Sequence, residues 1–402
     1  MWCWGNCRST RLRPVAGVLP AAIHAAANDN PLICPASCGG EAAWAGEMEI
    51  LAPQNLLQLI NHLKGTQLLS RPEARLADAD DATAPPDLAR VKGQESAKRA
   101  LEIAAAGGHN LLMCGPPGSG KSMLASCLPG ILPPLSPAEA LEVSMIHSLA
   151  GTLPEGGLMK TRPYRDPHHS ASLPALIGGG ARAKPGEISL AHCGVLFLDE
   201  LPEFARGTLE SLRQPLETGR ALIARANSHV TYPARFQLIA AMNPCRCGYL
   251  GDPAQECTKA PRCGLDYQSR LSGPLLDRMD LQIDVGAVAV ADLTAPSGER
   301  SADVARRVAM ARMIQADRYK GRPVTETTNA HCPPDWLEQA IAMGDDAHSL
   351  LQRAADTLNF SARAYHRLIR VARTIADLEQ AETIRASHMA EAVASRRRLA
   401  TN

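Results

Sequence analysis

Eight consecutive residues in the first third of the chain match the pattern of a phosphate-binding loop, G-x-x-x-x-G-K-S. A short apolar run precedes them at residues 110–114, and a helical pattern starts at residue 122. In such a loop the glycines turn backbone N–H groups towards phosphates, the lysine reaches the β and γ phosphates, and the serine hydroxyl binds Mg²⁺. The alternative is a glycine turn that happens to precede a lysine, and the flanking strand and helix patterns disfavour it. The predicted ATP-binding residues of this loop are Gly115, Pro116, Pro117, Gly118, Ser119, Gly120, Lys121 and Ser122, with Ser122 also a magnesium ligand.

Two adjacent carboxylates are the second chemical feature. Asp199 and Glu200 follow an apolar run at residues 195–198. Hydrolysis of ATP needs one carboxylate to hold Mg²⁺ and another to orient or activate water, and we assign these roles to Asp199 and Glu200 respectively. Taken alone, the pair could equally begin a helix, whose dipole favours acidic residues. Its occurrence together with the phosphate-binding loop favours ATP hydrolysis.

Four cysteines form the third feature, in the segment 243–263. They are Cys245, Cys247, Cys257 and Cys263, and their spacing, C-x-C-x9-C-x5-C, differs from the paired C-x2-C knuckles of zinc ribbons. Four thiols in a loop rich in glycine and proline can still close a tetrahedral structural Zn²⁺ site. Unligated reduced thiols are the main alternative. Disulfides are disfavoured, because an ATPase is expected in a reducing compartment.

The elements that must position these residues follow an α/β pattern. Apolar strands are predicted at residues 110–114, 195–198 and 236–241, with a helix at residues 94–106, which favours a parallel sheet covered on both faces. Beyond residue 300 only amphipathic helices are predicted, at residues 302–319, 334–343, 348–358, 362–378 and 387–398. We therefore expect an α/β P-loop NTPase core at residues 89–295, an all-helical lid at residues 296–402, a linker at residues 71–88, and an α+β segment at residues 1–70.

Composition limits the class of protein further. The 402 residues are 45% apolar and 21% charged, with a formal net charge of +1, which argues against binding nucleic acid through bulk charge and leaves room for a local basic surface. No run of eighteen apolar residues occurs, so we expect no membrane span. Arg8, Arg11 and Arg13 loosely imitate a secretory signal, but Pro20 and His24 interrupt the apolar run that follows. A cytoplasmic protein is expected.

These features occur within long segments that resemble the ComM/YifB family of magnesium-chelatase-like AAA+ ATPases, from about residue 32 to residue 400. The segments are VKGQESAKRALEIAAAGGHNLLMCGPPGSGKSMLA, RPYRDPHHSASLPALIGGGARAKPGEISLAHCGVLFLDELPEF, LRQPLETGRALIARANSHVTYPARFQLIAAMNPCRCG, SGPLLDRMD and SARAYHRLIRVARTIADL. The resemblance implies a AAA+ core and ATP with Mg²⁺ as cofactors. It also implies that Val91, Gly93 and Gln94 lie near the adenine.

The resemblance assigns three further residues to catalysis. Asn243, at the end of the predicted strand 236–241, matches the residue that senses the γ-phosphate. Arg278 resembles the arginine finger offered to a neighbouring subunit, because its planar fork can spread charge over the transferring phosphoryl group. Arg363 resembles the second sensor of the lid. For each arginine the alternative is a solvated surface charge.

The resemblance also implies a homo-hexameric motor with hairpin insertions at residues 168–184 and 221–232, acting on single-stranded or branched DNA as a branch-migration helicase of natural transformation. The candidates for phosphate contacts are Arg182, Lys184, Arg220 and Arg225, or else these are exposed charges that keep the hairpins soluble. A chelatase-type or protein-remodelling ATPase that does not bind nucleic acid is the second hypothesis, and an inactive truncated paralogue is the third. The chain departs from the family at its N-terminus, where most of a domain related to the Lon protease domain is expected to be missing.

Overall fold

A computed structural model describes most of the chain. The described residues are 2–3, 11–74, 84–153, 157–180, 183–225, 228–251, 257–288, 296, 298–323, 327–334, 336–337, 341–358 and 360–396. Half of the expected linker at residues 71–88 and part of the expected helix at residues 334–343 lie outside them.

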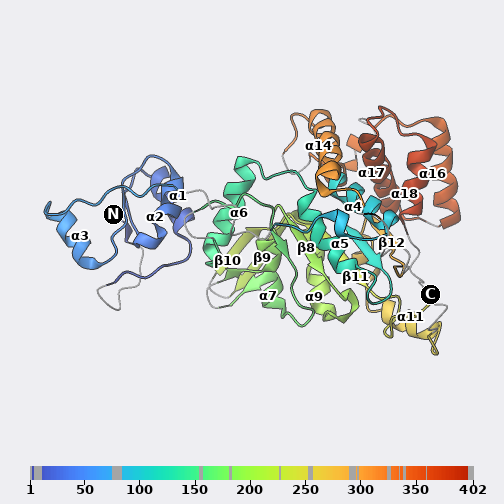
Figure 1. The fold of residues 1–402 in the computed structure, drawn as a ribbon, viewed down its shortest axis with the longest axis horizontal. Helices are drawn as coiled ribbons and strands as arrows, with labels where there is room; N and C mark the ends of the chain where they lie inside the picture. Colours follow the sequence, from blue (N-terminus) through green and yellow to red (C-terminus); the bar gives the residue numbers. More distant parts are fainter. Residues whose placement is uncertain are drawn as a thin grey trace.

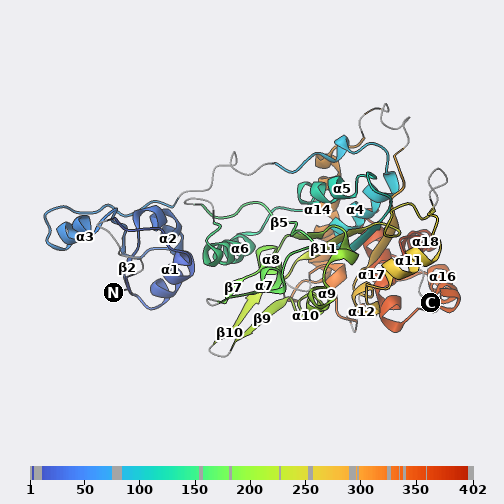
Figure 2. The ribbon, with the colours of Figure 1, turned by 90° about the horizontal axis from the view of Figure 1, so that it is seen from below.

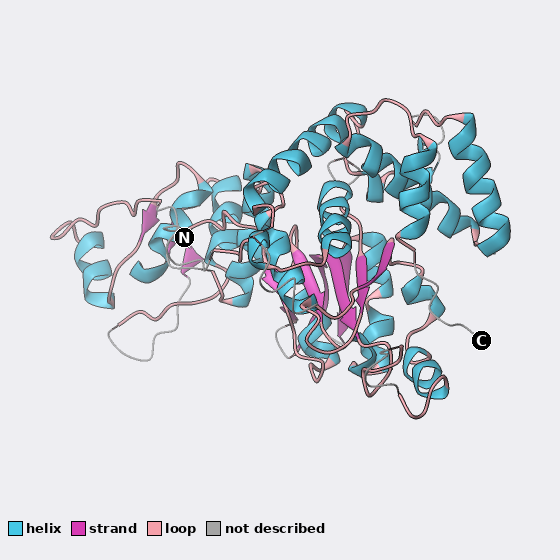
Figure 3. Ribbon diagram, turned by 45° about the vertical axis from the view of Figure 1, so that its right-hand side comes forward, coloured by secondary structure: helices cyan, strands magenta, loops and turns pink. Residues whose placement is uncertain are grey.

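A five-stranded parallel sheet forms the centre of the molecule (Figure 3). Its strand order is β12-β4-β11-β8-β5. The strands are β4 (Leu111–Cys114), β5 (Tyr164–Arg165), β8 (Val195–Leu198), β11 (Gln237–Met242) and β12 (Leu281–Asp284). The three predicted strands are therefore confirmed to within one residue, and they are the three central strands of the sheet.

Alternate side chains of these strands face opposite sides of the sheet, as the pleat requires. Leu111 and Met113 join one core with α4, α5, α14 and α17, whereas Leu112 and Cys114 join a second core beneath α8 and α9. The helices of the α/β region are α4 (Glu95–Gly107), α5 (Lys121–Cys127), α6 (Pro137–Ala150), α8 (Glu187–Leu190), α9 (Arg206–Ser211), α10 (Arg213–Thr218), α11 (Arg262–Gln268) and α12 (Gly273–Leu276).

The C-terminal region is helical, as predicted (Figure 1, orange and red). It contains α14 (Ser301–Arg318), α16 (Asp345–Leu358), α17 (Ala362–Leu378) and α18 (Ala386–Ala394). The expected helix at residues 387–398 is too long, because the chain turns at Ser395, whose carbonyl accepts a hydrogen bond from the Gln282 N–H of β12 (2.7 Å). The lid packs directly on α4 of the core, so the two share one hydrophobic cluster.

Two insertions project from the core on the same side. The strands β9 (Arg220–Arg225) and β10 (Ser228–Pro233) pair antiparallel, which confirms the predicted hairpin at residues 221–232 (Figure 2). The predicted hairpin in the region 168–184 is confirmed only at its C-terminal end, where β6 (Gly178–Gly179) and β7 (Lys184–Pro185) pair antiparallel. The segment first forms a helix, α7 (Leu173–Ile177), whose N-cap Ser172 accepts from the Ala175 N–H, and only then the two-residue strands β6 and β7.

A small N-terminal unit lies at one end of the molecule (Figure 1, blue). It contains α1 (Val18–Ala27), α2 (Gly39–Ala42), α3 (Leu56–Leu63) and a parallel sheet of β1 (Trp2–Cys3), β2 (Leu32–Ile33) and β3 (Ile50–Leu51). It docks on α6, where the Gly17 N–H donates to the Ser148 carbonyl (2.9 Å) and the Ser148 hydroxyl donates to Glu41. Within the described residues, no helix has the length and apolar character needed to span a membrane.

Candidate nucleotide site

The order of the strands explains how three distant segments meet. β11 lies between β4 and β8, and all three are parallel, so their carboxyl ends share one edge of the sheet. The phosphate-binding loop follows β4, Asp199 and Glu200 follow β8, and Asn243 follows β11. Ligands of open parallel sheets bind at this edge.

Lys121 lies at the centre of the site and is 7% exposed. Its Nζ donates to the carbonyls of Gly115 and Pro116 (2.8 Å each) and lies 3.5 Å from Asn243 Oδ1. Burial lowers the pKa of Lys121, while the nearby Asp199 carboxylate favours the charged form. A bound phosphate would offer Lys121 a charged oxygen acceptor, which makes a stronger hydrogen bond than the two neutral carbonyls do. The ammonium group is therefore placed to exchange the carbonyls for phosphate.

Ser122 and Asp199 form the second contact of the site. The Ser122 hydroxyl donates to Asp199 Oδ2 at 2.7 Å. Neighbouring ligands of an octahedral Mg²⁺ lie about 3 Å apart, so these two oxygens fit the predicted ligand pair. Glu200 has a positive φ of 50°, and its N–H donates to Asp199 Oδ1 (2.9 Å), which fixes its backbone beside Asp199.

A cavity of about 380 Å³ connects these groups. Its lining residues are Pro117, Gly118, Ser119, Gly120, Lys121, Ser122, Met123, Asp199, Glu200 and Asn243. Gly118 and Gly120 have φ of 75° and 86°, a backbone conformation that glycine adopts readily, and this lets the loop wrap around the cavity. The size falls in the range of small-ligand sites.

Of the three residues expected near the adenine, Gln94 contacts the same loop. The Gln94 side chain donates to the carbonyls of Ser119 (3.3 Å) and Gly286 (2.6 Å). Gly93 has a φ of 61°, and Val91 is buried in the core. The Gln94 contact ties the turn before α4 to the phosphate-binding loop.

The two catalytic arginine candidates lie elsewhere. Arg278 precedes β12 at the amino edge of the sheet, where its carbonyl accepts from the Asn110 side chain (3.0 Å). Its guanidinium is buried and paired with Glu217 of α10, and it also donates to the Pro274 carbonyl (2.6 Å). Burial lowers the pKa of Arg278, and Arg363 is one of the charges close enough to lower it further. Arg278 therefore lies at the opposite edge of the sheet from its own phosphate-binding loop, and Arg363 is close enough for the two charges to interact.

The four cysteines converge, as predicted. The Sγ atoms of Cys245, Cys247, Cys257 and Cys263 all lie within 4.8 Å of one another, and all four are free thiols. A tetrahedral Zn–S site has sulfur atoms about 3.8 Å apart, so the cluster fits Zn²⁺. The loop also touches the phosphate-binding loop, because a Cβ on Gly248 would lie 2.6 Å from Pro117 Cδ.

Glu142, His192 and Cys193 also lie close enough together to suggest a metal site. The guanidinium of Arg235, however, already fills this place, donating to Glu142 (2.6 Å) and lying near Cys193 Sγ (3.9 Å). His192 is likewise satisfied, with Glu142 at Nε2 (2.9 Å) and the Arg235 N–H at Nδ1 (3.0 Å). We interpret this cluster as a structural ion pair.

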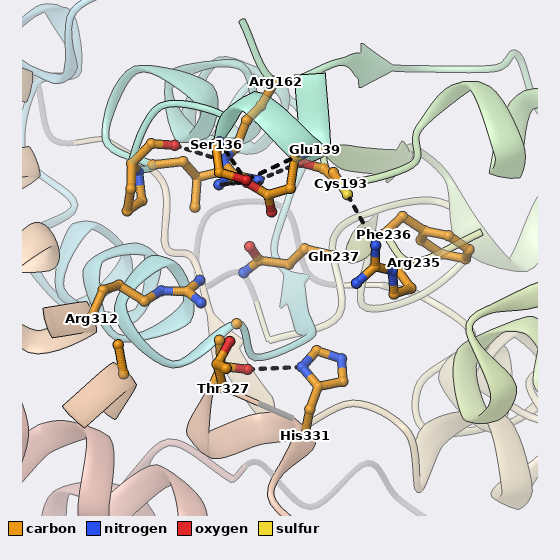
Figure 4. A pocket seen from close by; sticks show the side chains of 16 residues that line it. Ser136, Glu139, Arg162, Cys193, Arg235, Phe236, Gln237, Arg312, Thr327 and His331 are labelled. Carbon is orange, nitrogen blue, oxygen red and sulfur yellow. Dashed lines mark hydrogen bonds and ion pairs between the residues drawn. The ribbon is translucent and has the colours of Figure 1, made fainter. Parts of the chain in front are cut away.

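A second cavity, of about 330 Å³, lies between the core and α14 (Figure 4). Arg312 and Arg235 approach it from opposite sides, with Gln237 between them. Arg312 donates twice to the Ala105 carbonyl (3.0 and 2.7 Å) and Gln237 donates to the Ala104 carbonyl (2.9 Å), so both cap the C-terminus of α4. A cation is favourable at a helix C-terminus, so Arg312 of α14 stabilises the end of α4. Because Arg312 joins α14 to α4, we interpret the cavity as part of the junction between core and lid.

The DNA-binding candidates are on the insertions. Lys184 and Arg220 are exposed. Arg225 ends β9, with its backbone paired to Ser228. Arg182 lies outside the described residues. The insertions touch one another, since the Tyr232 hydroxyl donates to the Ala183 carbonyl (2.9 Å).

Two residues at this site were not predicted from the sequence: Met123, which lines the cavity, and His169, which contacts Glu200. His169 Nδ1 lies 3.3 Å from Glu200 Oε2. The two residues are 31 positions apart, and nothing in the local pattern around the histidine pair in RDPHHS indicates such a contact.

The sheet order, the loop after β4, the acidic pair after β8 and the helical C-terminal region define a P-loop protein of the AAA+ fold. Comparison with known families is consistent with this class. The family described as "Magnesium chelatase, subunit ChlI" matches residues 87–293, and "Magnesium chelatase, subunit ChlI C-terminal" matches residues 298–396.

Comparison with individual relatives identifies the family within this class. Competence protein ComM of Haemophilus influenzae is 43% identical over 395 residues, which cover 96% of this chain and 75% of ComM. The uncharacterized protein YifB of Escherichia coli is 43% identical over 387 residues, 96% of this chain and 74% of YifB. The magnesium-chelatase 38 kDa subunit of Rhodobacter capsulatus is 28% identical over 171 residues, 38% of this chain and 49% of the subunit. The chain therefore belongs to the ComM/YifB family of magnesium-chelatase-like AAA+ proteins.

Proposed function

We propose that this chain hydrolyses ATP with Mg²⁺ and that identical subunits assemble into a ring that moves on DNA. The observation that carries the ATPase part is the contact of Ser122 with Asp199 at 2.7 Å, with Lys121 beside it. A hydroxyl, a carboxylate and a buried ammonium around one cavity are the groups that phosphoryl transfer requires.

The residues divide the reaction among themselves. Lys121 offsets the charge of the β and γ phosphates, and Asn243 orients the terminal phosphate. Ser122 and Asp199 would hold Mg²⁺, and the bound ion would supply positive charge to offset the charge of the transferring phosphoryl group. Glu200 orients the attacking water and accepts its proton, so that the γ-phosphoryl group leaves ADP and becomes phosphate.

DNA is the partner we favour for the insertions. Lys184 and Arg220 expose positive charge on two projecting segments of a chain whose net charge is only +1, and localised cations are what a phosphate backbone requires. A relative that covers almost the whole chain is named a competence protein, whereas the match to a chelatase subunit covers 38% of the chain. The alternatives, a chelatase-type or remodelling ATPase, would use the same motor without nucleic acid.

The deciding measurement is the steady-state ATPase rate with and without single-stranded and forked DNA at low salt. We expect a stimulation of several fold that declines as salt is raised, because phosphate contacts release counterions. The double variant Lys184→Ala, Arg220→Ala should keep the basal rate and lose most of the stimulation, while Lys64→Ala in the N-terminal unit, which removes one exposed charge, should keep both rates. A flat response to both DNAs would contradict the DNA part of the proposal and favour the alternatives.

We also propose that the four cysteines hold one structural Zn²⁺ ion. Soft thiolates at tetrahedral spacing favour this metal. Protein purified without chelator should contain about one zinc per chain, and Cys257→Ser should lose the zinc and weaken ATP binding, because the cysteine loop supports Pro117. Cys193→Ser, outside the cluster, is the control. Less than about a tenth of an equivalent of zinc would favour unligated thiols.

A further inference from the structure

The cavity between the core and α14 is lined by three arginines, and their charges are not equally compensated (Figure 4). Arg162 pairs with Glu139 at 3.3 Å. Arg235 pairs with Glu142 at 2.6 Å. Arg312 of α14 instead donates to a backbone carbonyl, and among the described residues no carboxylate forms an ion pair with it. One positive charge at this cavity therefore has no negative partner within the described part of the chain.

The guanidinium of Arg312 also has donors to spare. An arginine carries five N–H groups, and Arg312 directs two of them, through Nε and Nη2, to the Ala105 carbonyl. The remaining three form no hydrogen bond to any residue that the structure describes. Burial, together with the nearby charge of Arg162, lowers the pKa of Arg312 to about 10, so the side chain stays charged at neutral pH in surroundings that disfavour the charge. An anion in the cavity would accept these N–H groups and compensate the charge.

A hydroxyl borders the same space as the guanidinium. Gly108 ends α4 with a φ of 75°, and a Cβ on this residue would lie 3.6 Å from Arg312 Nη2 and 3.2 Å from Thr328 Oγ1. The glycine therefore leaves open the space between the guanidinium and the hydroxyl. A guanidinium fork with a neighbouring hydroxyl suits the several oxygen atoms of a phosphate group.

The cavity has room for more than a phosphate group. Its volume is about 330 Å³, whereas one water molecule occupies about 30 Å³ of liquid. Leu132 and Phe236 supply apolar wall, and Phe236 lies across the cavity from Arg312 (Figure 4). Apolar walls with a few convergent polar groups are typical of small-molecule sites. The arrangement fits a ligand with a phosphate at one end and an apolar part at the other.

We propose that this cavity is a second ligand site, which binds a small phosphorylated molecule through Arg312 and Thr328. The site is distinct from the nucleotide site, because its lining residues Gly194 and Gln237 lie at the amino ends of β8 and β11, whereas Asp199 and Asn243 follow the carboxyl ends. The ligand would contact both α14 and the end of α4, so it would hold the lid against the core. The proposal depends on neither ATP hydrolysis nor DNA.

Phenyl phosphate is a suitable probe, because it joins a phosphate to an apolar ring. We expect the full chain, saturated with Mg²⁺ and a slowly hydrolysed ATP analogue, to bind it with a Kd of about 1 mM or tighter, measured by saturation-transfer NMR. Arg312→Gln should weaken binding about tenfold or more, while Arg306→Gln, at an exposed position of α14, should leave it unchanged. Benzoate, whose carboxylate has one oxygen fewer and less charge, should bind more weakly, and equal binding of the two probes would overturn the choice of phosphate.

A second comparison keeps the test decisive if Arg312→Gln fails to fold. Ala316 is exposed, lines the cavity and lies one turn beyond Arg312 on α14. Ala316→Glu places a carboxylate beside the guanidinium and should abolish binding of phenyl phosphate, whereas Ala316→Gln, of similar size and uncharged, should retain it. Equal binding by these two variants would overturn the proposal. Binding that disappears when the ATP analogue is added would also overturn it, because the probe would then occupy the phosphate-binding loop.

Discussion

At the residue scale, we expect substitution of Lys121 to affect ATP binding and substitution of Glu200 to affect ATP hydrolysis. Lys121→Ala should lower ATP affinity by about a hundredfold or more, because it removes a buried ammonium that would bond to phosphate. Glu200→Gln should bind ATP normally and hydrolyse it about 10² to 10³ times more slowly, because the amide cannot accept the proton of water. Fluorescent ATP titration and phosphate release measure the two quantities.

A neighbouring carboxylate supplies the control for this prediction. Glu203 lies one turn beyond Glu200 and pairs with Arg270 at 3.1 Å. Glu203→Gln should hydrolyse ATP at close to the parental rate. Turnover of Glu200→Gln at the parental rate would show that another group activates the water.

At the scale of elements, Asp280 links the sheet to the lid. Its carboxylate accepts from the Asn110 N–H (3.0 Å) and lies 3.4 Å from Arg367 of α17. Burial alone would raise the pKa of Asp280, but the neighbouring His109, Arg367 and the Asn110 N–H outweigh it and lower the pKa to about 2. A pKa below the unfolded value of about 3.9 means that the carboxylate stabilises the fold above pH 4, and that this contribution is lost as pH falls from about 4 to about 2.

Asp280→Asn should therefore lower the free energy of unfolding by about 2 kcal/mol at neutral pH, with the difference from the parent shrinking below pH 4. Urea unfolding at pH 7 and at pH 3 measures both values. Asp303→Asn, whose pair with Arg306 on α14 is exposed, is the matched control and should change little. A difference that persists unchanged at pH 3 would contradict the role of the charge.

Elements also show which features the sequence could predict. The strands that precede the phosphate-binding loop and the acidic pair are short apolar runs next to distinctive motifs. The local sequence pattern was therefore sufficient to predict these two strands. In the insertion that begins at His168, the helix α7 and the bounds of the hairpin were not predicted, because strands of two residues, Gly178–Gly179 among them, are too short to show alternation. The pairing of Arg278 with Glu217, 61 positions away, depends on tertiary packing that no local pattern contains.

At the scale of the whole molecule, the position of Arg278 bears on how the subunits work. It lies at the amino edge of the sheet, about one strand length, or roughly 13 Å, from the edge that carries its own phosphate-binding loop. Its guanidinium is bound to Glu217, which is 57% exposed, so a neighbouring nucleotide could take the place of that carboxylate. Arg363 lies close by and is exposed, and we expect both arginines to act on the site of an adjacent subunit.

Mixing two inactive variants tests this arrangement. Arg278→Ala should bind ATP yet hydrolyse it poorly, while Lys121→Ala should not bind ATP but still offers an intact Arg278. In an equal mixture, about a quarter of the interfaces in a closed ring combine an intact loop with an intact arginine, so up to a quarter of the parental rate should return. The control is a mixture of Lys121→Ala with Arg306→Ala, which changes an exposed arginine of α14. This mixture should show only the ATPase rate expected when active subunits are diluted with Lys121→Ala. Size-exclusion chromatography of Glu200→Gln with ATP should show whether the subunits assemble into a ring.

If the subunits form a ring and mixing restores no activity, Arg278 acts within its own subunit or only maintains the fold.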